Sequence, residues 1–278
     1  MNLINAALDI LFVWRLGMGA GGVGLGTAIA EWAALATGIA IAFYVLGPGA
    51  IAAIRTQRAS LFTAPAIRRL FAVNANIMIR TIALLLMFAW FANAGARLGT
   101  VPLAANQVLM QFVSISAFVL DGFAFTAESR IGGAIGRGSR ADYLRAIRLT
   151  GEFTFGAGLL FAALIFAIGD PVIAFVTDNQ AVRDTAGDLL HFTALVPLIG
   201  APAWLLDGIF IGATEGRALR NSAVVATAAY VLTDLALRPM AADGVWIALL
   251  SGYAYRALAL GCYMPRLTRS IAPAPPAQ

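Results

Sequence analysis

The chain has 278 residues, of which 60% are hydrophobic and only 12% are charged. A soluble domain averages about 45–50% apolar and about 25% charged residues, so the composition excludes an ordinary soluble protein and predicts an integral membrane protein. The formal net charge of +5 would suit a nucleic-acid-binding protein, but the arginines lie in short loops between apolar runs, and we predict no nucleic-acid partner. The single cysteine, Cys262, and the single histidine, His191, leave little for a metal centre or for a Ser-His-Asp site. We therefore predict neither an enzyme nor a bound metal or cofactor.

Eight apolar segments follow one another along the chain. They lie at roughly 2–13, 22–46, 71–92, 103–127, 149–168, 189–211, 222–237 and 244–264. A helix that crosses a bilayer needs about 20 residues, so the first segment is short, and the chain is expected to open inside a helix. The longest connection, 47–70, is punctuated by Gly47-Pro48-Gly49 and Pro65, which predicts a boundary between two helical bundles. The proline-rich C-terminal segment, 265–278, is predicted to be a disordered tail.

Arginines alternate between the two sides of this helical array. One side receives thirteen: Arg55, Arg58, Arg68, Arg69, Arg130, Arg137, Arg140, Arg145, Arg148, Arg217, Arg220, Arg266 and Arg269. The other receives four: Arg15, Arg97, Arg183 and Arg238. Cytoplasmic loops of membrane proteins carry an excess of Lys and Arg, so the arginine-rich side and the C-terminus are predicted to be cytoplasmic. The alternation supports eight crossings by an all-α, multi-pass protein of the inner (plasma) membrane, with the lipid bilayer as its partner.

The segment at 103–127 carries a file of polar side chains. It would form roughly 37 Å of helix at about 1.5 Å per residue, enough to cross a hydrocarbon core of about 30 Å. The polar residues step by four, three, seven and seven positions and so share one helix face: Gln107, Gln111, Ser114, Asp121 and Glu128. An acid at mid-helix costs about 2.5–3.5 kcal/mol on insertion scales, so this face should meet protein or a water-filled cavity. Asp121 is then either a structural counter-ion or an acid on an ion pathway.

The segment at 71–92 places an arginine near the middle of the membrane. Asn76 and Arg80 are four residues apart and share a helix face, and Arg80 lies roughly 14 Å from the start of the segment by helical rise. An arginine at this depth needs an anionic partner or water. Asp121 and Asp207 are the expected partners, and a permanent structural ion pair is the alternative to a functional one.

Two prolines, Pro197 and Pro202, interrupt the segment at 189–211. Prolines at mid-membrane bend or open a helix, and broken helices tend to line the cavities of transporters. Trp204 and Asp207 lie two and five residues after the second proline. We therefore expect both to lie on a substrate or ion pathway.

Several motifs, in order and across nearly the whole chain, resemble those of the multidrug and toxin extrusion (MATE) family, and within it the DinF-like branch. They are NAALDILFVWRLGMGAGGVGLGTAIAEW near the N-terminus, then NANIMIRTIAL, ARLGTVPLAANQVLMQF, LDGFAFTAESRIGGAIGRGSR and LDGIFIGATEGRALRN. The resemblance implies a fold of twelve helices in two six-helix lobes. It also implies efflux of drugs driven by H+ or Na+.

The same resemblance assigns each part of the chain to a place in that fold. Residues 1–46 match the last two helices of the N-terminal lobe, 47–70 a cytoplasmic linker between lobes, 71–264 the complete six-helix C-terminal lobe, and 265–278 a cytoplasmic tail. The first four helices would be absent, and with them the acid usually assigned to proton coupling in this branch. The family's Asn-Arg-Asp pattern reads Asn74-Ala75-Asn76 here, which neutralises a charged pair.

The function implied is secondary active antiport of amphipathic or cationic drugs and toxins against H+ or Na+, by an N-terminally truncated chain. The candidate residues of the substrate and ion pathway are Asn76, Arg80, Gln107, Gln111, Ser114, Asp121, Glu128, Trp204 and Asp207. Two alternatives remain. One is a non-transporting half-lobe membrane module that assembles with a partner chain. The other is a lipid-precursor flippase of the same superfamily.

Overall fold

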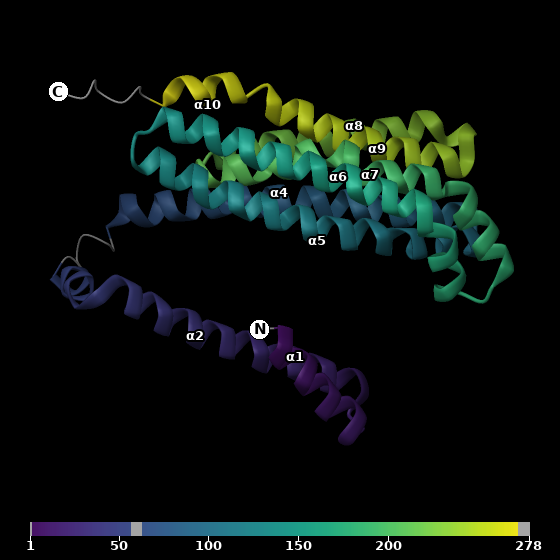
Figure 1. The fold of residues 1–278 in the computed structure, drawn as a ribbon, viewed down its shortest axis with the longest axis horizontal. Coiled ribbons are helices and arrows are strands. Elements are labelled where there is room, and N and C mark those ends of the chain that lie inside the picture. Colours follow the sequence, from purple (N-terminus) through teal and green to yellow (C-terminus); the bar gives the residue numbers. More distant parts are fainter. Residues whose placement is uncertain (1, 57–62, 272–278) are drawn as a thin grey trace. The chain divides into compact units, whose positions relative to one another are not determined.

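The computed structural model describes residues 2–56 and 63–271, and these residues are almost entirely α-helical (Figure 1). The prediction of an all-α protein is therefore confirmed. Contacts within the chain divide it into two compact units, Met1–Arg69 and Leu70–Gln278. The division falls at the end of the predicted 47–70 connection.

The first unit consists of a short helical segment packed on a long helix. Its elements are α1 (Asn2–Asp9), the π-helical η1 (Ile10–Arg15) and α2 (Gly19–Thr56). A hydrogen bond of 3.1 Å from Asn5 Nδ2 to Thr27 Oγ1 joins α1 to α2. α2 changes direction at Gly47, whose φ of 68° lies in the left-handed region that glycine tolerates. Even together, α1 and η1 are shorter than the about 20 residues that a bilayer crossing requires.

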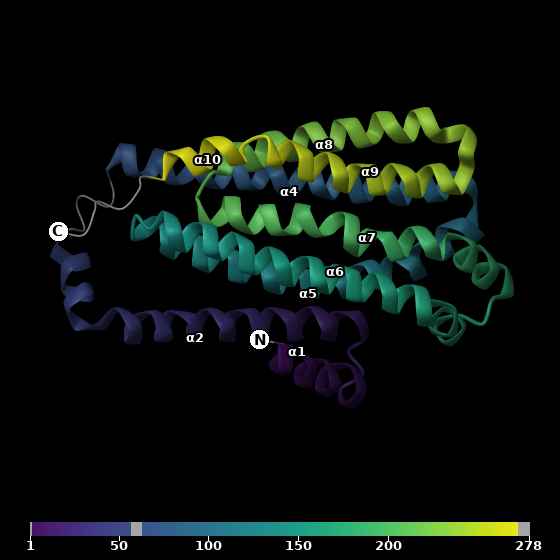
Figure 2. The same ribbon diagram turned by 45° about the horizontal axis from the view of Figure 1, so that its top comes forward.

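The second unit is a bundle of long helices whose successive members run in opposite directions (Figure 2). Its elements are α4 (Ala64–Leu98), α5 (Thr100–Gly136), α6 (Arg140–Val176), α7 (Gln180–Gly212), α8 (Gly216–Leu237), the 3₁₀-helical η2 (Arg238–Met240), α9 (Ala241–Gly261) and α10 (Met264–Ser270). The central helix is α7. In its apolar 18-residue stretch 67% of the residues are buried, against 28% in that of α5 and 22% in that of α6. Large apolar side chains on the outer helices, such as Phe118 and Phe166, remain exposed, as expected of a surface that faces lipid.

The described helices are long and apolar enough to cross a membrane in six stretches. These are Gly19–Gly47, Leu70–Leu98, Thr100–Gly136, Arg140–Val176, Gln180–Gly212 and Gly216–Ser270. The last stretch contains both α8 and α9, which run in opposite directions on either side of η2 (Figure 2). The chain is therefore an integral membrane protein, as its composition predicts. The exact number of eight crossings stays a prediction.

Two segments predicted to be irregular contain helix. In the predicted linker, α2 continues to Thr56 and α4 begins at Ala64, and residues 57–62 between them lie outside the described part of the chain. The prediction of a disordered tail from residue 265 is wrong as far as residue 270, because α10 packs on the bundle. Leu267 and Ile271 are buried there among apolar side chains. Burial of these two side chains stabilises the segment, and residues 272–278 lie outside the described residues.

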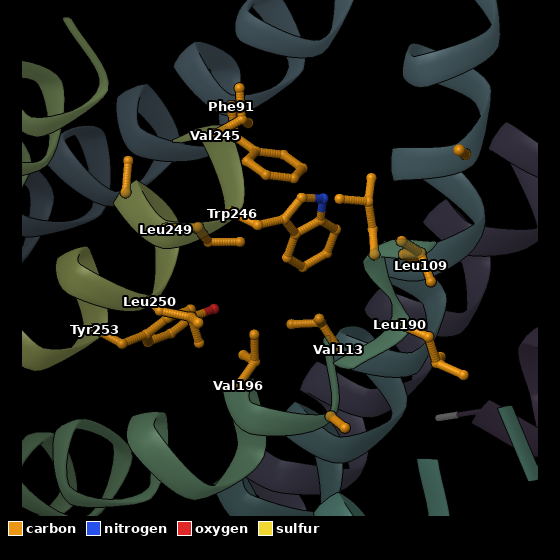
Figure 3. Close-up of a cluster of buried hydrophobic side chains, with 14 of the residues drawn as sticks. Phe91, Leu109, Val113, Leu190, Val196, Val245, Trp246, Leu249, Leu250 and Tyr253 are labelled. Atoms are coloured by element: carbon orange, nitrogen blue, oxygen red, sulfur yellow. The ribbon is translucent and has the colours of Figure 1, made fainter. Parts of the chain in front are cut away.

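A buried apolar cluster takes side chains from all the long helices of this unit, and Figure 3 shows the part that joins α4, α5, α7 and α9. Trp246 of α9 is completely buried and meets Phe91 of α4 edge-on, with ring centroids 5.2 Å apart. Its indole Nε1 donates a hydrogen bond of 2.9 Å to Asn106 Oδ1 of α5, which satisfies the polar atom of the ring. Val196 of α7 lies on the other side of the cluster (Figure 3). The cluster therefore holds four helices in fixed positions around the site described below.

The arginine-rich ends of the helices gather at one end of the second unit. The α5–α6 turn, the α7–α8 turn and α10 lie together there, and the α6–α7 and α8–α9 turns lie at the opposite end (Figure 1, Figure 2). This arrangement follows from the alternating direction of the helices, and it makes the orientation of the bundle testable.

An impermeant maleimide is expected to label Asp178→Cys in intact cells and to leave Ser270→Cys unmodified. Both substitutions are made in a Cys262→Ala chain, so that each variant has one thiol. Asp178 lies in the α6–α7 turn and Ser270 in α10, at opposite ends of the unit, and the arginine count assigns the α10 end to the cytoplasm. In permeabilised cells both thiols should react. Modification of Ser270→Cys from outside intact cells would contradict the predicted orientation.

Candidate functional site

Two glycines allow α7 to pack directly against α5. Gly208 and Gly212 are four residues apart and face the α5 backbone. A Cβ added at Gly208 would lie far inside the van der Waals distance of the Ala124 carbonyl oxygen, and one at Gly212 would collide with the Glu128 carbonyl oxygen. Small residues at this spacing are typical of close helix pairs in membranes. The close approach brings the acidic residues of α5 and α7 to similar depths in the bundle.

A cavity of about 390 Å³ lies beside this contact and is lined by α4, α5, α7 and α9. Its charged lining residues are Arg80, Asp121, Glu128, Asp207 and Arg256, and its large apolar and aromatic ones include Phe88, Met110, Phe125, Trp204 and Tyr253. The rings of Trp204 and Tyr253 lie 5.1 Å apart and form one aromatic wall. A mainly apolar pocket with a few charged groups is the usual construction of a small-molecule site. The apolar body and the charged group of an amphipathic ligand therefore both have partners in this cavity.

Asp207 of α7 binds two arginines from neighbouring helices. Its Oδ2 accepts hydrogen bonds from Nη2 of Arg80 on α4 and from Nη2 of Arg256 on α9. The side chains of Asp207, Arg80 and Arg256 are only 8%, 17% and 7% exposed. Charges removed from water are tolerated when they are paired and hydrogen-bonded. Of the two acids expected to pair with Arg80, Asp207 therefore does so, and it also binds a second arginine, which leaves the three ionised groups with a net charge of +1.

Asp121 of α5 faces the same charges but does not pair with them. The charges of Arg256, Asp207 and Arg80 all act on its half-buried carboxylate, yet within the described part of the chain both arginines form their ion pairs with Asp207 instead. Glu128 lines the cavity two turns further along α5. With two arginines and three acids, the charged lining has a net charge of −1 when all five groups are ionised. One proton or one monovalent cation neutralises it.

Six of the nine predicted pathway residues line the cavity, namely Arg80, Ser114, Asp121, Glu128, Trp204 and Asp207. The other three lie elsewhere. Gln107 and Gln111 are exposed and do not line the cavity, which reaches Met110 on the same helix. Asn76 accepts a hydrogen bond of 3.0 Å from Nη1 of Arg220. The predicted polar face of α5 is thus divided between the cavity and the exposed surface.

Sequence reasoning does not identify the α9 side of the site. Arg256 is an arginine in the middle of the apolar segment 244–264, the same signal that singles out Arg80, but its partner depends on which helices are neighbours. Tyr253, one turn earlier, has no signal beyond its aromatic ring. The Gly208–Gly212 spacing is readable in the motif GIFIG, and only the structure shows which helix it contacts.

Comparison with known proteins supports the resemblance found in the motifs. The MatE family model matches residues 77–240. The chain is 34% identical over 271 residues to DNA damage-inducible protein F of Escherichia coli, which covers 97% of this chain and 58% of that protein. It is 30% identical over 286 residues to multidrug resistance protein NorM of Vibrio vulnificus, with 96% of this chain and 61% of that protein covered. The chain thus spans about three fifths of the length of the curated relatives it matches.

Solved structures share the fold. The Vibrio cholerae MATE transporter VcmN in the bent form superposes with a TM-score of 0.77 at 17% sequence identity, over 96% of this chain and 60% of that chain. The eukaryotic MATE transporter AtDTX14 gives a TM-score of 0.75, also at 17% identity, over 97% of this chain and 62% of that chain. At such low identity the likeness shows the fold alone. Because the MatE model covers more than half of the residues, the chain belongs to the MATE family of multi-pass membrane proteins, as its motifs predict, and it is consistent with a DinF-like member.

Proposed function

We propose that the protein acts in secondary active antiport, exchanging amphipathic cationic compounds against H+ across the inner membrane. The observation that carries the proposal is the cavity in the second unit, whose five charged lining residues leave one uncompensated negative charge beside an aromatic wall. The relative NorM of Vibrio vulnificus is named for multidrug resistance, and VcmN of Vibrio cholerae, which shares the fold, is named a MATE transporter. The arginine-rich end of the bundle is assigned to the cytoplasm.

The lining of the cavity supports the substrate class. Trp204, Tyr253 and Phe125 offer aromatic faces to an apolar or cationic ligand. Asp121 and Glu128 offer carboxylates, because both arginines of the lining form their ion pairs with Asp207. A ligand with one positive charge and a flat apolar body would satisfy both. An anionic ligand would instead make the total charge of the occupied cavity −2, in surroundings of low dielectric constant where like charges repel strongly.

The geometry of the acids favours H+ as the coupling ion. A Na+ ion in a protein is held by several converging oxygen atoms, as other hard cations are, whereas the Asp207 carboxylate binds two guanidinium groups. The Ser114 hydroxyl donates to the Met110 carbonyl oxygen of its own helix at 2.8 Å. A proton needs only one carboxylate, and Asp121 supplies one that faces the cavity. Substrate and proton then compete for the same negative charge, which is the requirement of an exchange mechanism.

Binding of a cationic dye is expected to release protons, and Asp121→Asn is expected to abolish that release. Rhodamine 6G is titrated into the purified 278-residue chain by calorimetry in buffers of different ionisation enthalpy, which gives the number of protons released per dye bound. Loss of one charged contact worth about 1.5–3 kcal/mol should also weaken binding roughly tenfold or more. The wild-type chain should bind more weakly as the pH falls, because protonation removes the charge that attracts the dye.

Asp188→Asn is the matched control, since Asp188 lies exposed on α7, and it should leave dye affinity and proton release unchanged. Equal proton release by the wild-type chain and by Asp121→Asn would show that Asp121 is a structural acid. Dye binding that depends on Na+ and not on pH would overturn the choice of H+. If no amphipathic cation bound to the chain, the alternative function, a non-transporting membrane module that assembles with a partner chain, would be favoured.

A further inference from the structure

A second concave site lies between α5 and α6 at the arginine-rich end of the bundle. Its volume is about 860 Å³. Its lining is basic at the mouth, at Arg130, Arg137 and Arg145, and aromatic further along both helices, at Phe123 and Phe153. We call it the α5–α6 groove. It shares no lining residue with the cavity around Asp207.

A short, well-defined turn closes the end of the groove. Gly138 has a φ of 66°, and the backbone N–H groups of Gly138 and Ser139 donate to the carbonyl oxygens of Ile135 and Ala134 at 3.0 Å. This is the Schellman arrangement that ends a helix with glycine in the left-handed conformation. The Ser139 hydroxyl then accepts from the Asp142 backbone N–H at 3.2 Å and caps α6. The basic residues on either side of the turn are therefore held in fixed register.

The mouth of the groove carries excess positive charge. Three arginines, Arg130, Arg137 and Arg145, stand against one acid, Asp142. Arg137 forms an ion pair with Asp142 at 3.1 Å. Arg130 and Arg145 are exposed, and no ion pair of either occurs among the residues that the structure describes. The four ionised groups therefore carry a net charge of +2, and two guanidinium groups remain available to an anion.

Deeper along the same helices the groove becomes aromatic. The rings of Phe123 on α5 and Phe153 on α6 are stacked, with centroids 6.3 Å apart and planes 8° from parallel. They lie seven or eight residues from Arg130 and Arg145, which is about 10–12 Å of helical rise. The headgroup region of each leaflet is about 5–8 Å thick, since the bilayer is about 40–45 Å thick around a core of about 30 Å. The aromatic pair therefore lies at the depth of acyl chains when the arginines lie at the depth of phosphate groups.

We propose that the α5–α6 groove binds one anionic phospholipid, with its phosphate between Arg130 and Arg145 and an acyl chain along Phe123 and Phe153. Basic pockets between membrane helices are suited to such headgroups. The net charge of +2 distinguishes an anionic lipid from a zwitterionic one, and the aromatic pair distinguishes a lipid from free phosphate. A bound lipid at this position fills the space between α5 and α6 on the side of α5 away from its contact with α7.

The test is native mass spectrometry of the delipidated 278-residue protein, titrated with phosphatidylglycerol or phosphatidylcholine of the same acyl chains. The wild-type chain should retain one phosphatidylglycerol at concentrations where phosphatidylcholine is not retained. Arg130→Gln/Arg145→Gln should weaken phosphatidylglycerol binding roughly 25-fold, from about fivefold for each arginine removed. Arg130→Lys/Arg145→Lys should retain most of the affinity, which shows that a weakened Gln variant has lost charge and not its fold.

Arg217→Gln/Arg266→Gln is the matched control, because it removes the same charge from exposed positions at the same end of the bundle. It should bind phosphatidylglycerol as the wild-type chain does. Equal losses in the two Gln variants, or equal retention of phosphatidylcholine, would overturn the proposal. Phe153→Ala should weaken phosphatidylglycerol, whereas Phe166→Ala, which alters another exposed phenylalanine of α6, should not. If soluble glycerol phosphate displaced phosphatidylglycerol at an equal concentration, the groove would be a site for phosphate alone, and the proposal of a lipid site would be overturned.

Discussion

Replacing Asp207 by alanine is expected to reduce the free energy of unfolding by about 3–5 kcal/mol, because it removes the carboxylate that binds two buried arginines. Asp207 accepts hydrogen bonds from both Arg80 and Arg256, and all three side chains are largely buried. Its loss removes the link between α4, α7 and α9 and leaves two guanidinium groups that repel each other. The measurement is the midpoint of unfolding by SDS in mixed micelles, followed by the near-ultraviolet circular dichroism of the tryptophans.

Asp188→Ala, at an exposed site on the same helix, should leave that midpoint unchanged. The triple variant Arg80→Met/Asp207→Leu/Arg256→Met should recover most of the lost stability, because apolar groups of similar volume can replace a buried ionic cluster without loss. The triple variant separates stability from function, since it folds without the charges. If Asp207→Ala were as stable as Asp188→Ala, the two arginines would be solvated in solution, and the buried cluster would be contradicted.

Gly208→Ala/Gly212→Ala is expected to destabilise the bundle by roughly 1–3 kcal/mol for each methyl group, because the added atoms meet backbone that cannot move aside. The obstructing atoms are carbonyl oxygens of Ala124 and Glu128 on α5. To accommodate the methyl groups, α5 and α7 must separate, which moves Asp121 away from Asp207. We therefore expect dye binding to be lost together with stability, as measured by SDS unfolding and by calorimetry.

Gly122→Ala/Gly156→Ala is the control for this experiment, because nothing lies within 4 Å of a Cβ at either position. Here the same chemical change should stabilise the helices by about 0.5–1 kcal/mol for each residue, since alanine loses less conformational entropy than glycine on folding. The two double variants are thus expected to shift stability in opposite directions. Equal stabilisation by both would contradict the close contact between α5 and α7.

These effects meet in α7, which connects stability to the proposed transport chemistry. The helix contributes Gly208 and Gly212 to the contact with α5, Asp207 to the charge cluster and Trp204 to the aromatic wall, all within three turns. A movement of α7 relative to α5 would therefore change the distance between Asp121 and Asp207, the carboxylate that binds both arginines. The proposed competition between proton and substrate depends on that distance.

The sequence by itself determines that the chain enters a membrane, that it does so as helices, and that it belongs with MATE proteins. These properties depend on local hydrophobicity, on helical rise and on motifs, all of which are read along the chain. It also determines that Arg80 and Asp121 require compensation, because an isolated charge at that depth is too costly for any fold. Asp207 is a predicted partner for the same reason.

Only the tertiary structure decides which charges meet. Arg80 and Asp207 are 127 positions apart and Arg256 is 49 positions beyond Asp207, so their pairing depends on which helices are neighbours. Asp121 was an equally good partner for Arg80 by depth, but the contact of Gly208 and Gly212 with α5 sets how α7 faces the cavity.

Likewise, α10 is helical in a segment whose local sequence predicts disorder, because Leu267 and Ile271 are buried against an apolar surface of the bundle. Partner choice and burial are properties of packing, and periodicity along one helix carries no information about the rotation of its neighbour.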